Sequence, residues 1–135
     1  MEEMTAVVLN ARHGAIIMPD ATINVPFGWT ALVGRMLTKI EELPSEIRAY
    51  LMVTGIVIDE NGLLDVHVFA SPPHMPEGGW EQVEDIIADA RNEAAWSCIR
   101  DHRPAWIVRP PKGGPRPLCP ECQQAAGLTP ECHSA

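Results

Sequence analysis

Cysteines and histidines in the C-terminal part of the sequence have the types and spacing that could do chemistry. Cys119 and Cys122 form a C-x2-C pair, which lets two thiolates bind one tetrahedral metal ion from a tight turn, and Pro120 stiffens that turn. Cys98 and His102 lie four residues apart, so they share one face where a helix runs through both. The full pattern, C-x3-H-x16-C-x2-C, predicts a closed, structural zinc site.

Other ligand sets are compatible with the same chemistry. Asp101 can replace His102 as the fourth ligand, and Cys132 with His133 can complete the site, although adjacent ligands are geometrically awkward. The competing interpretation has no metal: Cys98 is then buried and inert, and the C-x2-C pair is free or redox-active. Clustered cysteines in a reducing cytosol are more often metal ligands than disulfides, which favours the zinc site.

The sequence lacks several common short motifs of enzyme active sites. It contains no G-x-S-x-G, no P-loop and no H-E-x-x-H. A nucleophilic pair of Cys98 and His102 would need a third residue to orient the imidazole, and no residue suggests itself. The sequence therefore favours a non-enzymatic protein.

A helix expected from about Trp80 to Ile99 leads into the predicted zinc site. Its apolar positions recur at helical spacing, so one side is buried. Its outer side carries acids and predicts a partner-binding surface, here called the acidic face. The acidic face consists of Glu81, Glu84, Asp85, Asp89 and Glu93. A solvated helix face without a partner is the competing interpretation, because charge runs usually are that.

Two further segments have clear periodicity. Residues 29–43 carry apolar side chains at helical spacing, and Pro44 predicts the end of this helix. Residues 50–58 and 63–69 read as strands joined at Asn61-Gly62, a strong hairpin signal.

The N-terminal residues predict short strands. Residues 6–9 and 15–18 are apolar and partly β-branched, and the sequence between them can form a turn. Pro19-Asp20 is expected to break the pattern, and residues 22–25 to add a third short strand.

The elements together predict an α+β fold, with a small antiparallel sheet packed against two principal helices and a C-terminal zinc finger-like segment. The expected division is an α+β core at 1–97, a Cys/His zinc-binding finger at 98–126 and a flexible tail at 127–135. The Pro/Gly-rich stretch after Asp101 is expected to be irregular.

Composition restricts the class of protein. The 135 residues allow one domain, and 46% hydrophobic residues are enough for a core. The 18 acidic and 10 basic residues give a net charge of −8, which argues against direct nucleic-acid binding. The start has no basic signal-peptide region and no apolar run reaches membrane-spanning length, so a soluble, cytoplasmic protein is expected.

The order of elements resembles a family of small uncharacterised zinc-binding proteins of phages and bacteria. The resemblance is carried by Gly28-Trp29 at the start of a helix, a helix ending at Ser97-Cys98, and a finger containing Trp106. The family has a second cysteine where this sequence has Asp101. The resemblance implies the fold and the metal, and it implies no settled activity.

A weaker resemblance is to the HNH endonucleases, through Asp101-His102 followed by the C-x2-C pair. It implies a metal-dependent nuclease with His102 as general base. Gln123 stands where that family has a metal-binding histidine, so a nuclease would be degenerate. This is the alternative function.

The function expected from these features is that of a zinc-containing acidic protein that binds a basic surface of a larger complex. An inhibitor of a host defence complex, of the anti-CRISPR type, is one concrete version. It follows from the charge and from the phage resemblance.

Overall fold

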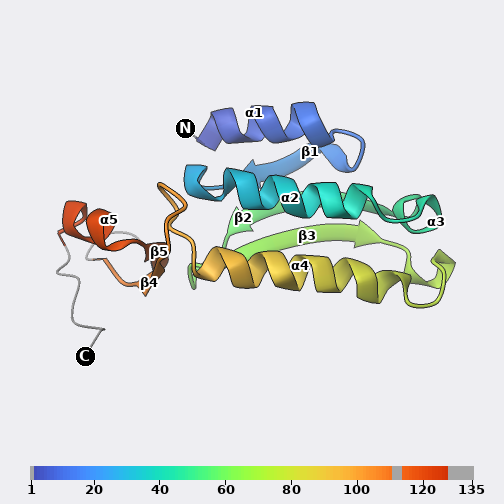
Figure 1. Ribbon diagram of the computed structural model, residues 1–135. Coiled ribbons are helices and arrows are strands. Elements are labelled where there is room, and N and C mark those ends of the chain that lie inside the picture. Colours follow the sequence, from blue (N-terminus) through green and yellow to red (C-terminus); the bar gives the residue numbers. More distant parts are fainter. Residues whose placement is uncertain (1, 111–113, 128–135) are drawn as a thin grey trace.

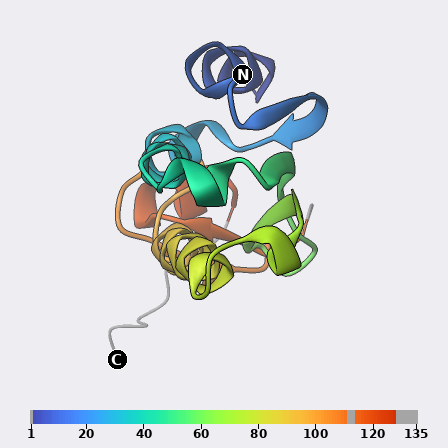
Figure 2. The same ribbon diagram turned by 90° about the vertical axis from the view of Figure 1, so that its right-hand side faces the viewer.

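The computed structural model describes residues 2–110 and 114–127, which form an α+β fold (Figure 1). A three-stranded sheet in the order β1-β2-β3 lies behind helices α2 and α4, which pack side by side over one of its faces (Figures 1 and 2). The main elements are α1 (Glu2–His13), β1 (Ile17–Asn24), α2 (Thr30–Glu41), β2 (Leu51–Ile58), β3 (Leu64–Ala70) and α4 (Gly79–Ala95). No helix in the described ranges is long and apolar enough to cross a membrane.

Helix α2 confirms the predicted helical period. It follows a 3-10 turn, η1 (Phe27–Trp29), and its apolar stripe is buried from Leu32 to Ile40. The helix ends at Glu41, before Pro44, since proline cannot continue a helix. Pro44 is instead the N-cap of one further helical turn, α3 (Ser45–Arg48).

The predicted hairpin is also confirmed. Strands β2 and β3 pair antiparallel, and Gly62 adopts a φ of 81°, the left-handed conformation that this turn needs. The carboxylate of Asp59 accepts hydrogen bonds from the amides of Asn61 (2.8 Å) and Leu63 (3.0 Å). A Cβ on Gly62 would lie 2.7 Å from the carbonyl carbon of Pro115, so the C-terminal segment also requires glycine here.

The N-terminal strand expected at residues 6–9 is wrong, because these residues belong to helix α1. The β-branched Val7 and Val8 favoured a strand, but Leu9 and His13, one helical turn apart, are both buried against the rest of the protein. The Nδ1 atom of His13 donates to Glu41 on α2 at 2.6 Å. Packing of one helix face therefore outweighs the local β preference.

The expected break at Pro19-Asp20 is wrong as well, because β1 runs through it to Asn24. Strand β1 is at the edge of the sheet, where a proline without an amide hydrogen is tolerated. The irregularity appears instead as a shift of register between Ile17 and Thr22. Since β1 pairs parallel to β2, the sheet is mixed and not purely antiparallel as expected.

Helix α4 ends at Ala95, four residues before the expected Ile99. Beyond it the backbone of residues 97–99 bonds to the core: the indole nitrogen of Trp29 donates to the Ser97 carbonyl at 3.0 Å. The Pro/Gly-rich remainder contains a two-stranded hairpin, β4 (Trp106–Val108) and β5 (Arg116–Leu118), and a short helix α5 (Pro120–Ala125). These elements surround a second, small buried cluster of Cys98, Ala105, Leu118 and Cys119.

Candidate metal centre

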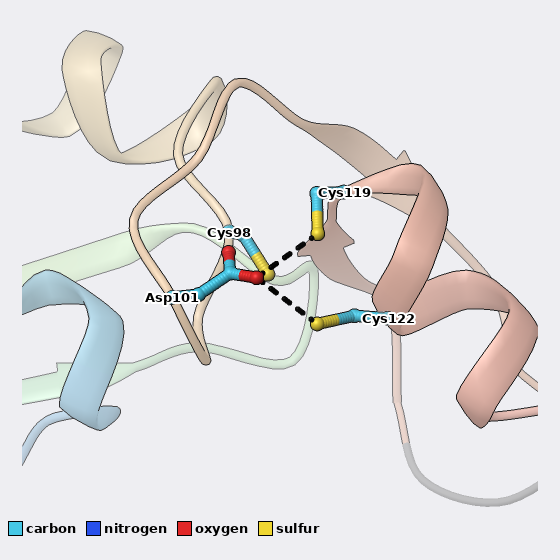
Figure 3. Close-up of side chains that lie close together, drawn as sticks. All are labelled: Cys98, Asp101, Cys119 and Cys122. Atoms are coloured by element: carbon cyan, nitrogen blue, oxygen red, sulfur yellow. Dashed lines mark hydrogen bonds between the residues drawn. The ribbon is translucent and has the colours of Figure 1, made fainter.

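Four groups able to bind a metal ion come together between the end of α4 and the start of α5. Their ligand atoms all lie within 4.8 Å of one another. The set, here called the donor cluster, consists of Cys98, Asp101, Cys119 and Cys122 (Figure 3). The carboxylate of Asp101 points between the sulfurs and accepts contacts from the thiols of Cys119 at 3.3 Å and Cys122 at 3.5 Å.

The first half of the donor cluster is a tight turn over residues 98–102. The amide of Cys98 donates to the Arg103 carbonyl at 2.9 Å, and the amide of His102 donates to the Cys98 carbonyl at 3.1 Å. The amide of Arg100 lies 3.5 Å from the Cys98 sulfur, which it would stabilise as a thiolate. His102 ends the turn with a φ of 66°, and it is the only described residue other than glycine with a positive φ.

The second half is the start of helix α5. Cys119 caps the helix, Pro120 occupies its first turn, and the spacing of three residues places Cys119 and Cys122 on the same side. The amide of Gln123 donates to the Cys119 carbonyl at 2.9 Å, and its buried side chain donates to the Leu118 carbonyl at 3.0 Å. These bonds hold the backbone from which both thiols project.

The 3-10 turn η1, which precedes α2, anchors the cysteine turn to the core. The amide of Gly28 donates to the Ile99 carbonyl at 2.7 Å, and His102 Nδ1 donates to the Gly28 carbonyl at 3.2 Å. A Cβ on Gly28 would overlap the carbonyl oxygen of Cys98 and lie 2.6 Å from the carbonyl carbon of Ile99. Gly28 is therefore a positioning residue for the donor cluster, a role that sequence reasoning missed because the contact spans some 70 positions of the chain.

The structure brings together the three predicted cysteine ligands but not His102. The helix expected to carry Cys98 and His102 on one face ends before either residue, at Ala95. The left-handed backbone at His102 directs its Nδ1 to Gly28, and Asp101, the alternative ligand, takes the fourth place. The other alternative, Cys132 with His133, lies outside the described residues.

The donor cluster favours a cation. Burial opposes ionisation of Asp101, but hydrogen bonds from the Arg103 amide and the cysteine thiols outweigh it, so the pKa of this carboxyl is lowered. Burial raises the pKa of the Cys119 thiol, and burial together with the neighbouring thiols raises the pKa of Cys122. A metal ion would supply the positive charge that lets these thiols ionise together.

All residues of the acidic face are exposed, as predicted, but two of them have neighbours of their own. Glu93 forms an ion pair with Arg35 of α2. Glu84 lines a groove between α4 and β3. Glu81, Asp85 and Asp89 have no ion pair with a described residue that would neutralise them.

Comparison with known proteins gives no match to a family model, to a curated protein or to a solved structure. The resemblances to the phage and bacterial zinc-binding proteins and to the HNH endonucleases therefore stay predictions. The geometry of the donor cluster is the observation on which a function can be argued.

Proposed function

We propose that the donor cluster binds one zinc ion as a closed structural site. The observation that supports this is the convergence of four donor atoms within 4.8 Å from two separate turns. Three thiolates and one carboxylate complete a tetrahedron without leaving a position for substrate, and thiolate-rich sites select zinc among the common divalent ions.

The C-terminal segment needs such a site for its stability. Behind the donor cluster the described residues contribute only Cys98, Ala105, Leu118 and Cys119 to the buried cluster, far less apolar surface than the main core. Zinc binding would join β4, β5 and α5 to the core through bonds that hydrophobic burial alone does not supply.

We further propose that the protein is a non-enzymatic acidic binding module that engages a basic surface of a larger complex in the cytoplasm. The net charge of −8 and the exposed acids of α4 support this. An inhibitor of a host defence complex, of the anti-CRISPR type, is one such function, and its support is this charge and the phage resemblance of the sequence.

Metal analysis of matched variants tests the zinc site. Protein purified without chelators should contain zinc, and Asp101→Ala should bind it at least tenfold more weakly, since it removes one of four ligands. His102→Asn is the matched control, because asparagine tolerates a positive φ and the structure keeps His102 outside the donor cluster. Zinc lost in His102→Asn and kept in Asp101→Ala would assign the fourth ligand to the histidine.

A nuclease assay tests the alternative function. Plasmid and single-stranded DNA should remain intact after incubation with the zinc-loaded protein and Mg²⁺ or Mn²⁺. His102 Nδ1 donates a hydrogen bond to the Gly28 carbonyl, which turns the imidazole away from the donor cluster. In this orientation His102 cannot act as a general base beside a metal ion bound there. Cleavage that His102→Asn abolishes would contradict the proposal and establish an HNH-like enzyme.

A further inference from the structure

Strand β3 has an unpaired edge within the described part of the chain. The carbonyl of Leu63 accepts from Asp59 at 2.8 Å and the amide of Ser71 donates to Tyr50 at 3.0 Å, so the odd-numbered residues of β3 face β2. Backbone groups alternate along an antiparallel strand. The amides and carbonyls of Val66 and Val68 therefore point away from the sheet, toward a free edge.

A groove of about 860 Å³ follows this edge. Val66, Val68 and Phe69 of β3 line one side, and Trp80, Glu84 and Ile87 of α4 line the other. In Figure 1, β3 is seen between α2 and α4, with α4 on the side of the free edge. Phe69 is 66% exposed, so the groove opens onto a large apolar side chain.

The dimensions of the two layers favour an extended strand as the occupant. Two packed helices about 8–10 Å apart cover roughly four strands at about 4.8 Å spacing. The described residues form three strands in this sheet, and the groove lies where α4 covers no further strand of theirs. A helix would not satisfy the outward backbone groups of Val66 and Val68, whereas a strand pairs with them directly.

The outer face of β3 determines the chemistry of this strand. His67 Nε2 lies 3.1 Å from a carboxylate oxygen of Asp65, and Phe69 is on the same face of the strand. Cross-strand neighbours are favourable when a cation faces Asp65 and an aromatic or β-branched residue faces Phe69. On the other face of the incoming strand, apolar side chains would meet Trp80 and Ile87.

We propose that the groove between β3 and α4 binds an extended peptide segment of the partner, which adds to the sheet as a fourth strand. Its side chains alternate between apolar residues toward α4 and basic or aromatic residues on the open face. This inference rests on the proposed function, because it names the part of a basic partner that the protein recognises. Glu84 on the wall of the groove attracts the same basic segment, while Arg91, which also lines the groove, lies 3.8 Å from the carboxylate of Asp59.

Selection from a displayed library of random decapeptides tests the proposal, with the zinc-loaded protein as bait. Enriched peptides should alternate apolar residues with residues that include lysine or arginine. Val68→Pro removes an outward amide without touching the bonds to β2 and should weaken the selected peptides roughly tenfold or more. Val68→Ala is the matched control, since it shortens the side chain but keeps the amide, and it should retain binding.

Peptides methylated on alternate backbone nitrogens provide a test that does not depend on the folding of Val68→Pro. Methylation of the set that faces β3 should abolish binding, and methylation of the other set should not.

The proposal is overturned by a selection that enriches nothing, by equal binding to the proline and alanine variants, or by a dimer that Val68→Pro dissociates, since the occupant would then be a second copy. If an Asp85→Lys/Asp89→Lys variant loses partner binding and Val68→Pro keeps it, the partner binds the acidic face and does not add a strand to β3.

Discussion

The identity of the fourth residue in the donor cluster depends on the backbone of one residue. His102 has a φ of 66°, a conformation that costs a non-glycine residue about 1 kcal/mol or more. Its hydrogen bond to the Gly28 carbonyl offsets part of this cost. The result is that the turn presents Asp101 to the three sulfurs and leaves the imidazole of the exposed His102 bonded to the Gly28 carbonyl.

The protonation of the ligands gives a prediction at the residue scale. Because the pKa values of the Cys119 and Cys122 thiols are raised, zinc binding must displace their protons, while the ionised Asp101 has none to release. Zinc affinity should therefore fall as the pH is lowered. Calorimetric titration in buffers of different ionisation enthalpy counts the released protons, and Asp101→Cys should release one more than the parent. Equal release by both proteins would remove Asp101 from the site.

Gly28 provides a second prediction at this scale. Gly28→Ala places a methyl group against the backbone of Cys98 and Ile99. Because this overpacks the contact, the free energy of unfolding should fall by about 2 kcal/mol. The matched control is Gly34→Ala within α2, where the nearest atom outside the helix is His13 Nε2 at 4.0 Å. That control should stabilise the protein by roughly 0.5–1 kcal/mol, since alanine is the better helix former. Denaturant unfolding measures both, and a Gly28→Ala variant as stable as the parent would contradict the anchoring role.

At the scale of elements, the sequence predicts those helices and strands that local patterns of residues determine. Helix α2 and the hairpin at Asn61-Gly62 were predictable because apolar spacing and turn chemistry are local. Helix α1 and the end of α4 were not, since each depends on distant contacts: His13 with Glu41, and the Ser97 carbonyl with Trp29. The cysteines of the site were predictable from spacing, whereas the place of Asp101 follows from a turn that no spacing rule specifies.

Removal of one sulfur ligand tests the dependence of the C-terminal elements on metal. Cys119→Ser should release β4, β5 and α5 from the core while β2 and β3 keep their structure, because the two buried clusters are largely separate. The binding energy of a structural zinc is on the order of 10 kcal/mol, so the loss should be extensive. Hydrogen exchange should show lost protection from about residue 98 onward and a lower melting temperature.

Cys132→Ser is the control for this experiment, because it also removes one cysteine and Cys132 is the ligand of the alternative set. It should keep both zinc and the protection of the C-terminal segment. Zinc loss in Cys132→Ser, with Asp101→Ala unaffected, would show that the tail completes the site.

At the scale of the whole molecule, one residue belongs both to the acidic face and to the groove beside β3. Glu84 of the acidic face lines this groove, and Arg91, which also lines it, lies 3.8 Å from Asp59. Neighbours at i, i+4 on α4, such as Asp85 and Asp89, repel each other by a few tenths of a kcal/mol. A basic partner would relieve this repulsion, so the acidic face and the open strand edge can contribute to one binding surface.

Reversal of charge on this surface gives the prediction at the largest scale. Asp85→Lys/Asp89→Lys should slow association with a basic partner roughly tenfold at low salt, because steering depends on the local field, and leave the fold and zinc content unchanged. Association of the parent should weaken steeply with salt, since exposed charges are screened over about 10 Å at 0.1 M.

Asp20→Lys/Glu46→Lys is the matched control: both residues are exposed acids outside α4, so net charge changes equally while the acidic face stays intact. Stopped-flow or surface-based kinetics with a partner recovered by affinity capture separates the two. Equal slowing in both double variants would mean that net charge alone steers the partner. No slowing in either would mean that the acidic face is a solvated helix surface that binds no partner.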